Sequence, residues 1–163
     1  MMRVGHGFDA HRLIEGRRLV LGGITVPHDR GALGHSDADV LAHALSDALL
    51  GAAAMGDLGG HFPDSDPQWR GADSSRFVTA TLQLLERRGL RVMNADLTLL
   101  AQAPRIAPWR EEIRRSVALK LGLRESQVNL KATTTEQLGF LGRGEGLAAM
   151  ATVLIDDAPA ATA

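Results

Sequence analysis

The spacing of apolar residues changes several times along the chain, between the two-residue period of strands and the longer period of helices. Five segments are expected to be strands on this basis: residues 2–14, 18–27, 90–102, 127–133 and 147–155. Glu15 and Gly16 are interpreted as the turn between the first two strands. Gly22 and Gly23 interrupt the second strand, and they indicate a bulge or a close approach of another backbone.

Helical spacing predicts three helices, at residues 36–56, 73–88 and 104–121. The first is supported by Leu41, Leu45, Ala48, Leu49 and Ala52, which recur on one face. Ser36 is its expected N-cap, with acidic residues in the first turn, and Asp73 or Ser74 is the expected cap of the second helix. Each helix is expected to stop at a glycine, namely Gly56, Gly89 and Gly122.

This order of elements predicts a single α/β domain of the α+β sandwich type, in which a mixed β-sheet is covered by about three helices. The domain is expected to span residues 1–155, and the tail 156–163 is expected to be disordered. Loops are expected at 28–35, 56–72 and 139–146. The second is long and rich in Gly, Pro and Asp, and such loops are usually functional or disordered.

Composition narrows the functional classes. The 163 residues suit one domain, and a net charge of −1 gives no reason to expect a nucleic acid or an anionic membrane as partner. The longest nearly apolar stretch, residues 147–155, is too short to span a bilayer, and no secretory signal opens the chain. A cytoplasmic location is therefore expected. Because the chain has no cysteine, disulfides and thiolate chemistry are excluded.

Asp9 and His11 form a candidate pair of metal ligands. Residues two apart on a strand face the same side, so both side chains would point one way, and His43 would join them from the first helix. One aspartate and two histidines suit a catalytic Zn²⁺, which keeps a fourth position open. Asp39 and Asp47 lie one helical turn to either side of His43 and are candidates to accept its second N–H. The alternative is a half-buried helical histidine beside an acid, which is the better interpretation of His43 taken alone.

Three other segments have two interpretations each. His35 and Ser36 stand before the first helix, where an anion could bind, although Ser36 alone is better explained as an N-cap. The acidic loop could bind a cation or sugar hydroxyls, or its acids could be turn residues. The string Lys131 to Glu136 could hold phosphate oxygens and Mg²⁺, or it could be a Thr-rich strand. No Walker-type loop is present.

Taken together, these strings resemble the 2-C-methyl-D-erythritol 2,4-cyclodiphosphate synthase family of the non-mevalonate isoprenoid pathway. The matching segments are Gly-His-Gly-Phe-Asp-Ala-His (5–11), His-Ser-Asp-Ala-Asp (35–39) with His43, Gly-Asp-Leu-Gly (56–59), Phe-Pro-Asp-Ser-Asp-Pro (62–67), Ala-Gln-Ala-Pro (101–104), Lys-Ala-Thr-Thr-Thr-Glu (131–136) and Gly-Phe-Leu-Gly-Arg-Gly-Glu-Gly (139–146). The resemblance covers residues 2–155. The length of the chain argues against a fusion with the preceding cytidylyltransferase.

The resemblance implies a reaction and a set of site residues. The 2-phosphate of 4-diphosphocytidyl-2-C-methyl-D-erythritol 2-phosphate would attack the β-phosphorus, release CMP and close a cyclic diphosphate. Asp9, His11 and His43 would hold Zn²⁺, and Glu136 would hold Mg²⁺ or Mn²⁺. His35 and Thr134 would steady the developing charge. The implied substrate contacts are Ser36, Asp57, Leu58, Gly59, Phe62, Pro63, Asp64, Ser65 and Asp66 on one side, and Ala101, Gln102, Ala103, Pro104, Arg105, Ile106, Ala107, Thr133 and Thr135 around the cytidine.

The resemblance also implies a homotrimer with its active sites at the subunit interfaces. Phe8, Phe140, Arg143 and Glu145 match positions that line a central cavity of the family, where an isoprenoid diphosphate would bind, with Phe140 and Arg143 among its contacts. The alternative for Arg143 and Glu145 is a structural ion pair. Two other classes compete with the cyclising enzyme: another metal phosphoesterase, and a non-catalytic zinc-binding trimer.

Overall fold

The computed structural model describes residues 1–63 and 65–157, and its centre is a five-stranded sheet with the order β4-β1-β7-β5-β6. The strands are β1 (Met2–Glu15), β4 (Arg30–Ala32), β5 (Arg91–Leu100), β6 (Val128–Thr133) and β7 (Gly146–Asp156). Neighbouring strands are antiparallel except for β5 and β6, which run parallel. The sheet is therefore mixed, as predicted.

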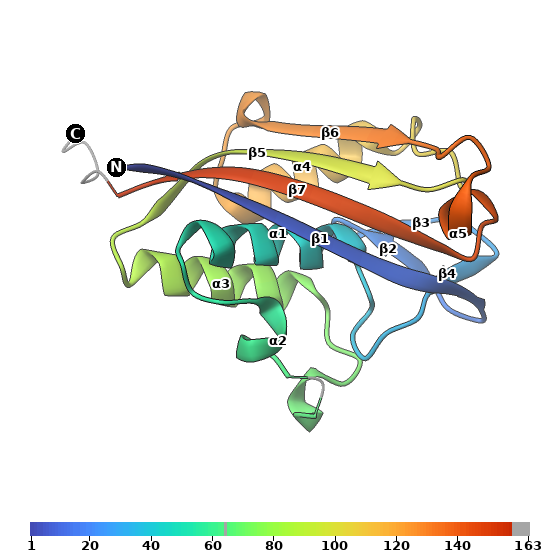
Figure 1. Cartoon of the computed structure of the whole chain (residues 1–163), viewed down its shortest axis with the longest axis horizontal. Coiled ribbons are helices and arrows are strands. Elements are labelled where there is room, and N and C mark those ends of the chain that lie inside the picture. Colours follow the sequence, from blue (N-terminus) through green and yellow to red (C-terminus); the bar gives the residue numbers. More distant parts are fainter. Residues whose placement is uncertain (64, 158–163) are drawn as a thin grey trace.

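Three long helices pack on one face of this sheet: α1 (Val40–Ala52), α3 (Ser75–Glu86) and α4 (Arg110–Leu121) (Figure 1). Short helices α2 (Leu58–His61) and α5 (Gly139–Gly142), and the 3₁₀ turns η1 (Pro67–Trp69) and η2 (Glu125–Gln127), lie in the connections. The predicted fold class, a single domain with a mixed sheet covered by about three helices, is confirmed. Among the described residues, no helix is both long and apolar enough to cross a membrane.

Two glycines let α1 lie directly on β1. A Cβ atom at Gly5 would overlap the carbonyl oxygen of Ala48, and one at Gly7 would overlap that of Ala44. With no side chain between them, the helix backbone approaches the strand more closely than usual helix–sheet packing allows. This contact brings His43, on α1, to the side chains that β1 projects from Asp9 and His11.

The opposite face of the sheet carries no helix from the described part of the chain. Side chains of β1 alternate between the two faces, and those that point away from the helices are largely exposed. Four large apolar side chains on this face expose between 39% and 70% of their area: Met2, Val4, Phe8 and Met150. An apolar surface of this kind in a folded domain marks an interaction site.

The segment 18–27, predicted as one strand, forms a separate hairpin of β2 (Leu19–Leu21) and β3 (Ile24–Val26). Gly22 and Gly23, expected to form a bulge, instead make its two-residue turn, with φ angles of 59° and 83°. Both angles are positive, which is the requirement of a tight hairpin turn. The adjoining segment 28–35, predicted as a loop, contains the short strand β4.

Two predicted helix starts are wrong. The third helix begins at Arg110 rather than 104, because residues before a proline avoid helical angles and Ala107 precedes Pro108. The first helix is capped by Asp39 rather than Ser36, since the Asp39 carboxylate accepts hydrogen bonds from the backbone N–H groups of Leu41 and Ala42. At the other end of the chain, β7 continues to Asp156, while residues 158–163 of the expected disordered tail lie outside the described residues.

Candidate functional site

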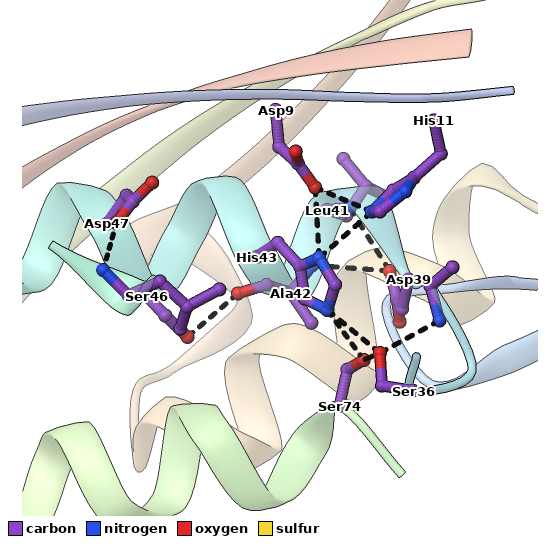
Figure 2. A network of polar contacts seen from close by, with 12 residues as sticks. Asp9, His11, Ser36, Asp39, Leu41, Ala42, His43, Ser46, Asp47 and Ser74 are labelled. Atoms are coloured by element: carbon purple, nitrogen blue, oxygen red, sulfur yellow. Dashed lines mark hydrogen bonds and ion pairs between the residues drawn. The ribbon is translucent and has the colours of Figure 1, made fainter. Parts of the chain in front are cut away.

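Asp9, His11 and His43 converge on one point beneath β1, as Figure 2 shows. Asp9 Oδ2 lies 2.8 Å from His11 Nε2 and 2.9 Å from His43 Nδ1, and the two ring nitrogens are 3.0 Å apart. The two-residue spacing on β1 places the first pair, and α1 supplies the third. The predicted grouping of these three residues is confirmed, and it fits a metal ion because all three offer lone pairs when the rings are neutral.

The proton of neutral His11 is placed by a backbone carbonyl. His11 Nδ1 lies 2.9 Å from the carbonyl oxygen of Leu33, and since a carbonyl can only accept, Nδ1 must donate. The other nitrogen, Nε2, then presents its lone pair to Asp9 and His43. An outer partner that fixes the tautomer in this way is a common feature of histidine ligands.

The outer partner predicted for His43 is wrong. Neither Asp39 nor Asp47 reaches its second ring nitrogen; His43 Nε2 instead lies 3.1 Å from Ser36 Oγ and 3.0 Å from Ser74 Oγ. The Asp39 carboxylate turns away to accept from the backbone N–H groups of Gly22 and Gly23. Asp47 accepts from the backbone N–H of Leu58 at 2.6 Å, and burial raises its pKa. The i±4 spacing on α1 brings the carboxylates of Asp39 and Asp47 near His43, but both carboxylates accept hydrogen bonds from backbone N–H groups instead.

The electrostatics of the three converging residues reflect their closeness. Burial alone would raise the pKa of Asp9, but hydrogen bonds with His11 and His43 outweigh it and hold that pKa well below the usual range. Burial would lower the pKa of His11, but its hydrogen bond and charge interaction with Asp9 raise the pKa overall. The closeness of the carboxylate and the imidazole thus favours the charged form of both Asp9 and His11.

A cavity of about 610 Å³ opens beside this centre. Its lining includes six of the predicted contact residues, which are His35, Ser36, Leu58, Gly59, Phe62 and Pro63. Trp69 and Phe77, which the sequence analysis did not single out, complete an aromatic wall with Phe62; the ring centroids of this wall lie 5.2–5.4 Å apart. Such a wall suits the carbon skeleton of a ligand, while the candidate metal ligands and backbone groups suit its polar parts.

Three of the other residues predicted around this cavity, Asp57, Ser65 and Asp66, do not line it. Asp57 caps α2 by accepting from the backbone N–H of Gly60 at 2.8 Å, and Asp66 caps η1 by accepting from Gln68 N at 3.1 Å. Ser65 is exposed. Asp64 lies outside the described residues.

The predicted cytidine residues gather in a second, smaller cavity of about 200 Å³. It lies where the parallel strands β5 and β6 end, and the backbone N–H of Ala101 donates to the Thr133 carbonyl at 3.1 Å. The predicted residues that line it are Ala101, Gln102, Pro104, Arg105, Ile106, Ala107, Thr133 and Thr134; Ala103 and Thr135 belong to the same two segments. Within residues 1–63 and 65–157, no residue lines both cavities.

Thr134 and Glu136 lie against each other at the end of β6. The Thr134 hydroxyl donates to Glu136 Oε1 at 3.0 Å, and the Glu136 backbone N–H donates to Thr134 Oγ1 at 3.2 Å. Glu136 and Gln137 have φ angles of 51° and 66°, a left-handed conformation that is costly for side chains other than glycine. The carboxylate is exposed and has room for a cation that prefers oxygen ligands.

The residues predicted to line a central cavity of the assembly are all exposed. Phe8 points outward from the uncovered face of the sheet, and Phe140 lies on α5. Arg143 Nε donates to Glu145 Oε1 at 2.6 Å. The structural ion pair, one of the two interpretations of Arg143 and Glu145, is thus present.

Comparisons with known proteins agree with this arrangement. The model of the YgbB family matches residues 2–156. The chain is 55% identical to the 2-C-methyl-D-erythritol 2,4-cyclodiphosphate synthase of Geobacillus kaustophilus (strain HTA426) over 155 residues. The aligned region covers 95% of this chain and 98% of that protein.

Two solved structures are similar throughout the fold. A CDP-bound 2C-methyl-D-erythritol-2,4-cyclodiphosphate synthase has a TM-score of 0.88 and 41% identity, covering 94% of this chain and 100% of its own. The bifunctional IspDF from Campylobacter jejuni has a TM-score of 0.91 and 39% identity, covering 95% of this chain, which spans 42% of that longer protein.

Proposed function

The chain belongs to the YgbB family, and on this premise we propose how its site works. Its activity is that of the 2-C-methyl-D-erythritol 2,4-cyclodiphosphate synthases, cyclising lyases of isoprenoid biosynthesis. The proposed substrate is 4-diphosphocytidyl-2-C-methyl-D-erythritol 2-phosphate. The observation that carries the proposal is the convergence of Asp9, His11 and His43 at the edge of a cavity of substrate size.

Two metal ions belong to the proposal. Asp9, His11 and His43 would hold Zn²⁺, because nitrogen and oxygen ligands with an open position are typical of catalytic zinc. Glu136 would hold Mg²⁺ or Mn²⁺, which prefer oxygen ligands. When bound, such ions neutralise phosphate charge and act as Lewis acids.

The residues of the chain would orient the reacting groups. An oxygen of the 2-phosphate forms a bond to the β-phosphorus, the bond from that phosphorus to the bridging oxygen breaks, and CMP leaves with the electron pair. Phe62 and Pro63 would confine the methylerythritol part in the larger cavity. His35 and the Thr134 hydroxyl would steady charge on the phosphates. Since both reacting groups belong to one molecule, orientation supplies much of the catalysis and no protein nucleophile is required.

A trimer would bring the two cavities of different chains together. Within one chain the sheet separates them, because β7 and β5 lie between β1 and β6. Three strand spacings of about 4.8 Å put about 14 Å between β1 and β6. The uncovered face of the sheet, with Met2, Val4, Phe8 and Met150, supplies an apolar surface for contact with two further copies.

The central cavity of that trimer remains part of the proposal. Phe8 and Phe140 would line it, and Arg143 would bind an isoprenoid diphosphate there only by exchanging its Glu145 partner for phosphate. The cytoplasmic location expected from the sequence also stays a prediction.

Product analysis with the diphosphocytidyl substrate tests the function. A cyclising enzyme releases CMP and the cyclic 2,4-diphosphate in equal amounts, which ³¹P NMR distinguishes from open-chain products. Inorganic phosphate or an open-chain diphosphate would instead indicate a metal phosphoesterase. Zinc binding without turnover would indicate a non-catalytic zinc protein.

A further inference from the structure

The second nitrogen of His43 faces a group of buried hydroxyls rather than an acid. Nε2 lies 3.1 Å from Ser36 Oγ and 3.0 Å from Ser74 Oγ, and the two hydroxyl oxygens are 3.1 Å apart. Both serines are buried, Ser74 completely. Figure 2 shows them on the side of the imidazole opposite Asp9 and His11. Because a hydroxyl can donate or accept, the position of the His43 proton depends on what the serines contact next.

Asp37 settles the direction of the Ser74 hydroxyl. Asp37 Oδ1 accepts from the backbone N–H groups of Asp39 and Ser74, each at 3.2 Å, and these groups can only donate. The oxygen is therefore an acceptor, so the Ser74 hydroxyl, which also contacts it, must give its single proton to Asp37. Ser74 Oγ is then left with lone pairs toward His43.

Ser36 completes the same pattern. Its oxygen accepts from the backbone N–H of Ala38 at 3.0 Å, and its proton can go to Ser74 Oγ. With the His43 proton on Nε2, this single N–H is shared between the two serine oxygens, and no contact in the group joins two lone pairs. With a lone pair on Nε2, Ser36 would donate to His43, and Ser74 Oγ would then face lone pairs on both Nε2 and Ser36 Oγ, two unpaired contacts in a buried site.

The contacts on the other side of the ring are compatible with this arrangement. Asp9 Oδ2 lies within hydrogen-bond distance of both His11 Nε2 (2.8 Å) and His43 Nδ1 (2.9 Å), so a proton carried by His11 Nε2 can be donated to Asp9 while His43 Nδ1 keeps its lone pair. His11 Nε2 and His43 Nδ1 are 3.0 Å apart, so they cannot both carry a proton.

We propose that Ser74 and Asp37 are positioning residues, which fix His43 with its proton on Nε2 and its lone pair on Nδ1, aimed at the metal ion. This inference deepens the proposed function and rests on it for the use of the Asp9–His11–His43 site. It assigns a role to the start of α3: Ser74 occupies the cap position of that helix but makes no capping hydrogen bond, because its hydroxyl serves His43.

The first test reads the tautomer directly. Long-range ¹H–¹⁵N correlation spectra of the metal-free protein near neutral pH distinguish a proton on Nε2 from one on Nδ1. The wild type is expected to show His43 protonated on Nε2. In Ser74→Ala, the Asp9 carboxylate should draw part of the His43 population to the Nδ1 form. His11 is the internal control, because its Nδ1 proton is held by the Leu33 carbonyl and should stay there.

The second test measures binding of Zn²⁺ alone by competition with a chelator. Ser74→Ala should weaken zinc binding about 10- to 100-fold, the usual cost of losing an outer partner of a metal ligand. Ser74→Thr keeps the oxygen and should recover much of the affinity. Ser46→Ala is the matched control: Ser46 is equally buried, on α1 itself, but its hydroxyl donates to the Ala42 carbonyl at 2.8 Å, so its loss should leave zinc affinity and the His43 tautomer unchanged.

Asp37→Asn is a second variant for both measurements, to be used if Ser74→Ala does not fold. The amide has the same shape but a weaker acceptor, so a smaller loss of zinc affinity and a smaller Nδ1 population are expected. A wild-type His43 protonated on Nδ1 would overturn the proposal, as would wild-type zinc affinity in both variants. Neither measurement uses substrate. A protein with the expected tautomer that makes no cyclic product would therefore contradict the proposed function and leave this inference standing.

Discussion

The candidate metal centre beneath β1 and the Thr134–Glu136 corner at the end of β6 differ in how completely one chain builds them. At the metal centre, every nitrogen of His11 and His43 has a partner, and the serines behind His43 are themselves bound to Asp37. At the corner, the Glu136 carboxylate is exposed and accepts a hydrogen bond from the neighbouring Thr134 hydroxyl. The first region is preorganised within one chain, whereas the second has an exposed carboxylate, to which the proposed trimer would bring substrate and another subunit.

The largest effect is expected from breaking the preorganised region. His43→Ala removes one of three metal ligands and should leave a folded protein with little zinc and activity reduced about 1000-fold or more, since metal charge stabilisation is worth several kcal/mol. Metal analysis and product formation measure the two effects. Full activity in a metal-depleted sample of this variant would refute the assignment.

The corner should respond differently. Glu136→Gln is expected to keep the zinc content of the wild type while turnover falls about 100-fold and loses its dependence on Mg²⁺ or Mn²⁺, because the amide carries no charge for the second ion. Zinc analysis and a metal titration of turnover separate these effects. If Glu136→Gln lost its zinc, the division into two independent regions would be wrong.

Mixed trimers test whether the two regions act across a subunit boundary. His43→Ala disables the metal centre, and Ala101→Trp fills the smaller cavity; each parent alone should be nearly inactive. In a closed ring every interface pairs opposite faces of two subunits, so random equal mixing should restore about a quarter of the sites. Activity after co-refolding is compared with that of the separate parents. Proof of mixed trimers by mass spectrometry, without recovery, would place each site within one chain.

The smallest expected effect is a pH dependence of the metal-free protein. The pKa of His11 is raised in the folded chain, so its charged form contributes stability below the unfolded pKa, and this contribution is lost as pH rises through the folded pKa. The Tm of the metal-free protein is therefore expected to fall as pH rises through this range. Thermal melts of His11→Ala at several pH values should lack the part of this pH dependence that His11 causes. If the Tm of that variant changed with pH as much as the Tm of the wild type does, another group would be responsible.

The sequence predicted those features that depend on local periodicity. Asp9 and His11 share a face because strand side chains alternate, and His43 could be placed on a helix by the leucines and alanines around it. The Gly22–Gly23 hairpin turn was misassigned because the same residues also suit a bulge. The start of α4 was misplaced because apolar residues continue upstream through Ile106 and Trp109.

The partners of His43 depend on packing between elements, which periodicity does not reveal. Ser74 is 31 residues from His43 and reaches it only because α1 and α3 pack side by side. A serine at a helix start is typical of an N-cap, and this common role concealed the contact. Trp69 and Phe77 were missed for a similar reason, since aromatic residues are usually part of a core.

The bare backbone contact at Gly5 and Gly7 has a consequence for ion size. Strand and helix already touch there, so the offset between the ligands from β1 and the ligand from α1 cannot widen or narrow without breaking the packing of the whole element. A cation of larger radius, such as Cd²⁺, can then be accommodated only by side-chain torsions. Discrimination between ions of similar chemistry but different radius is thus expected to depend on two residues that have no side chain and never contact the ion.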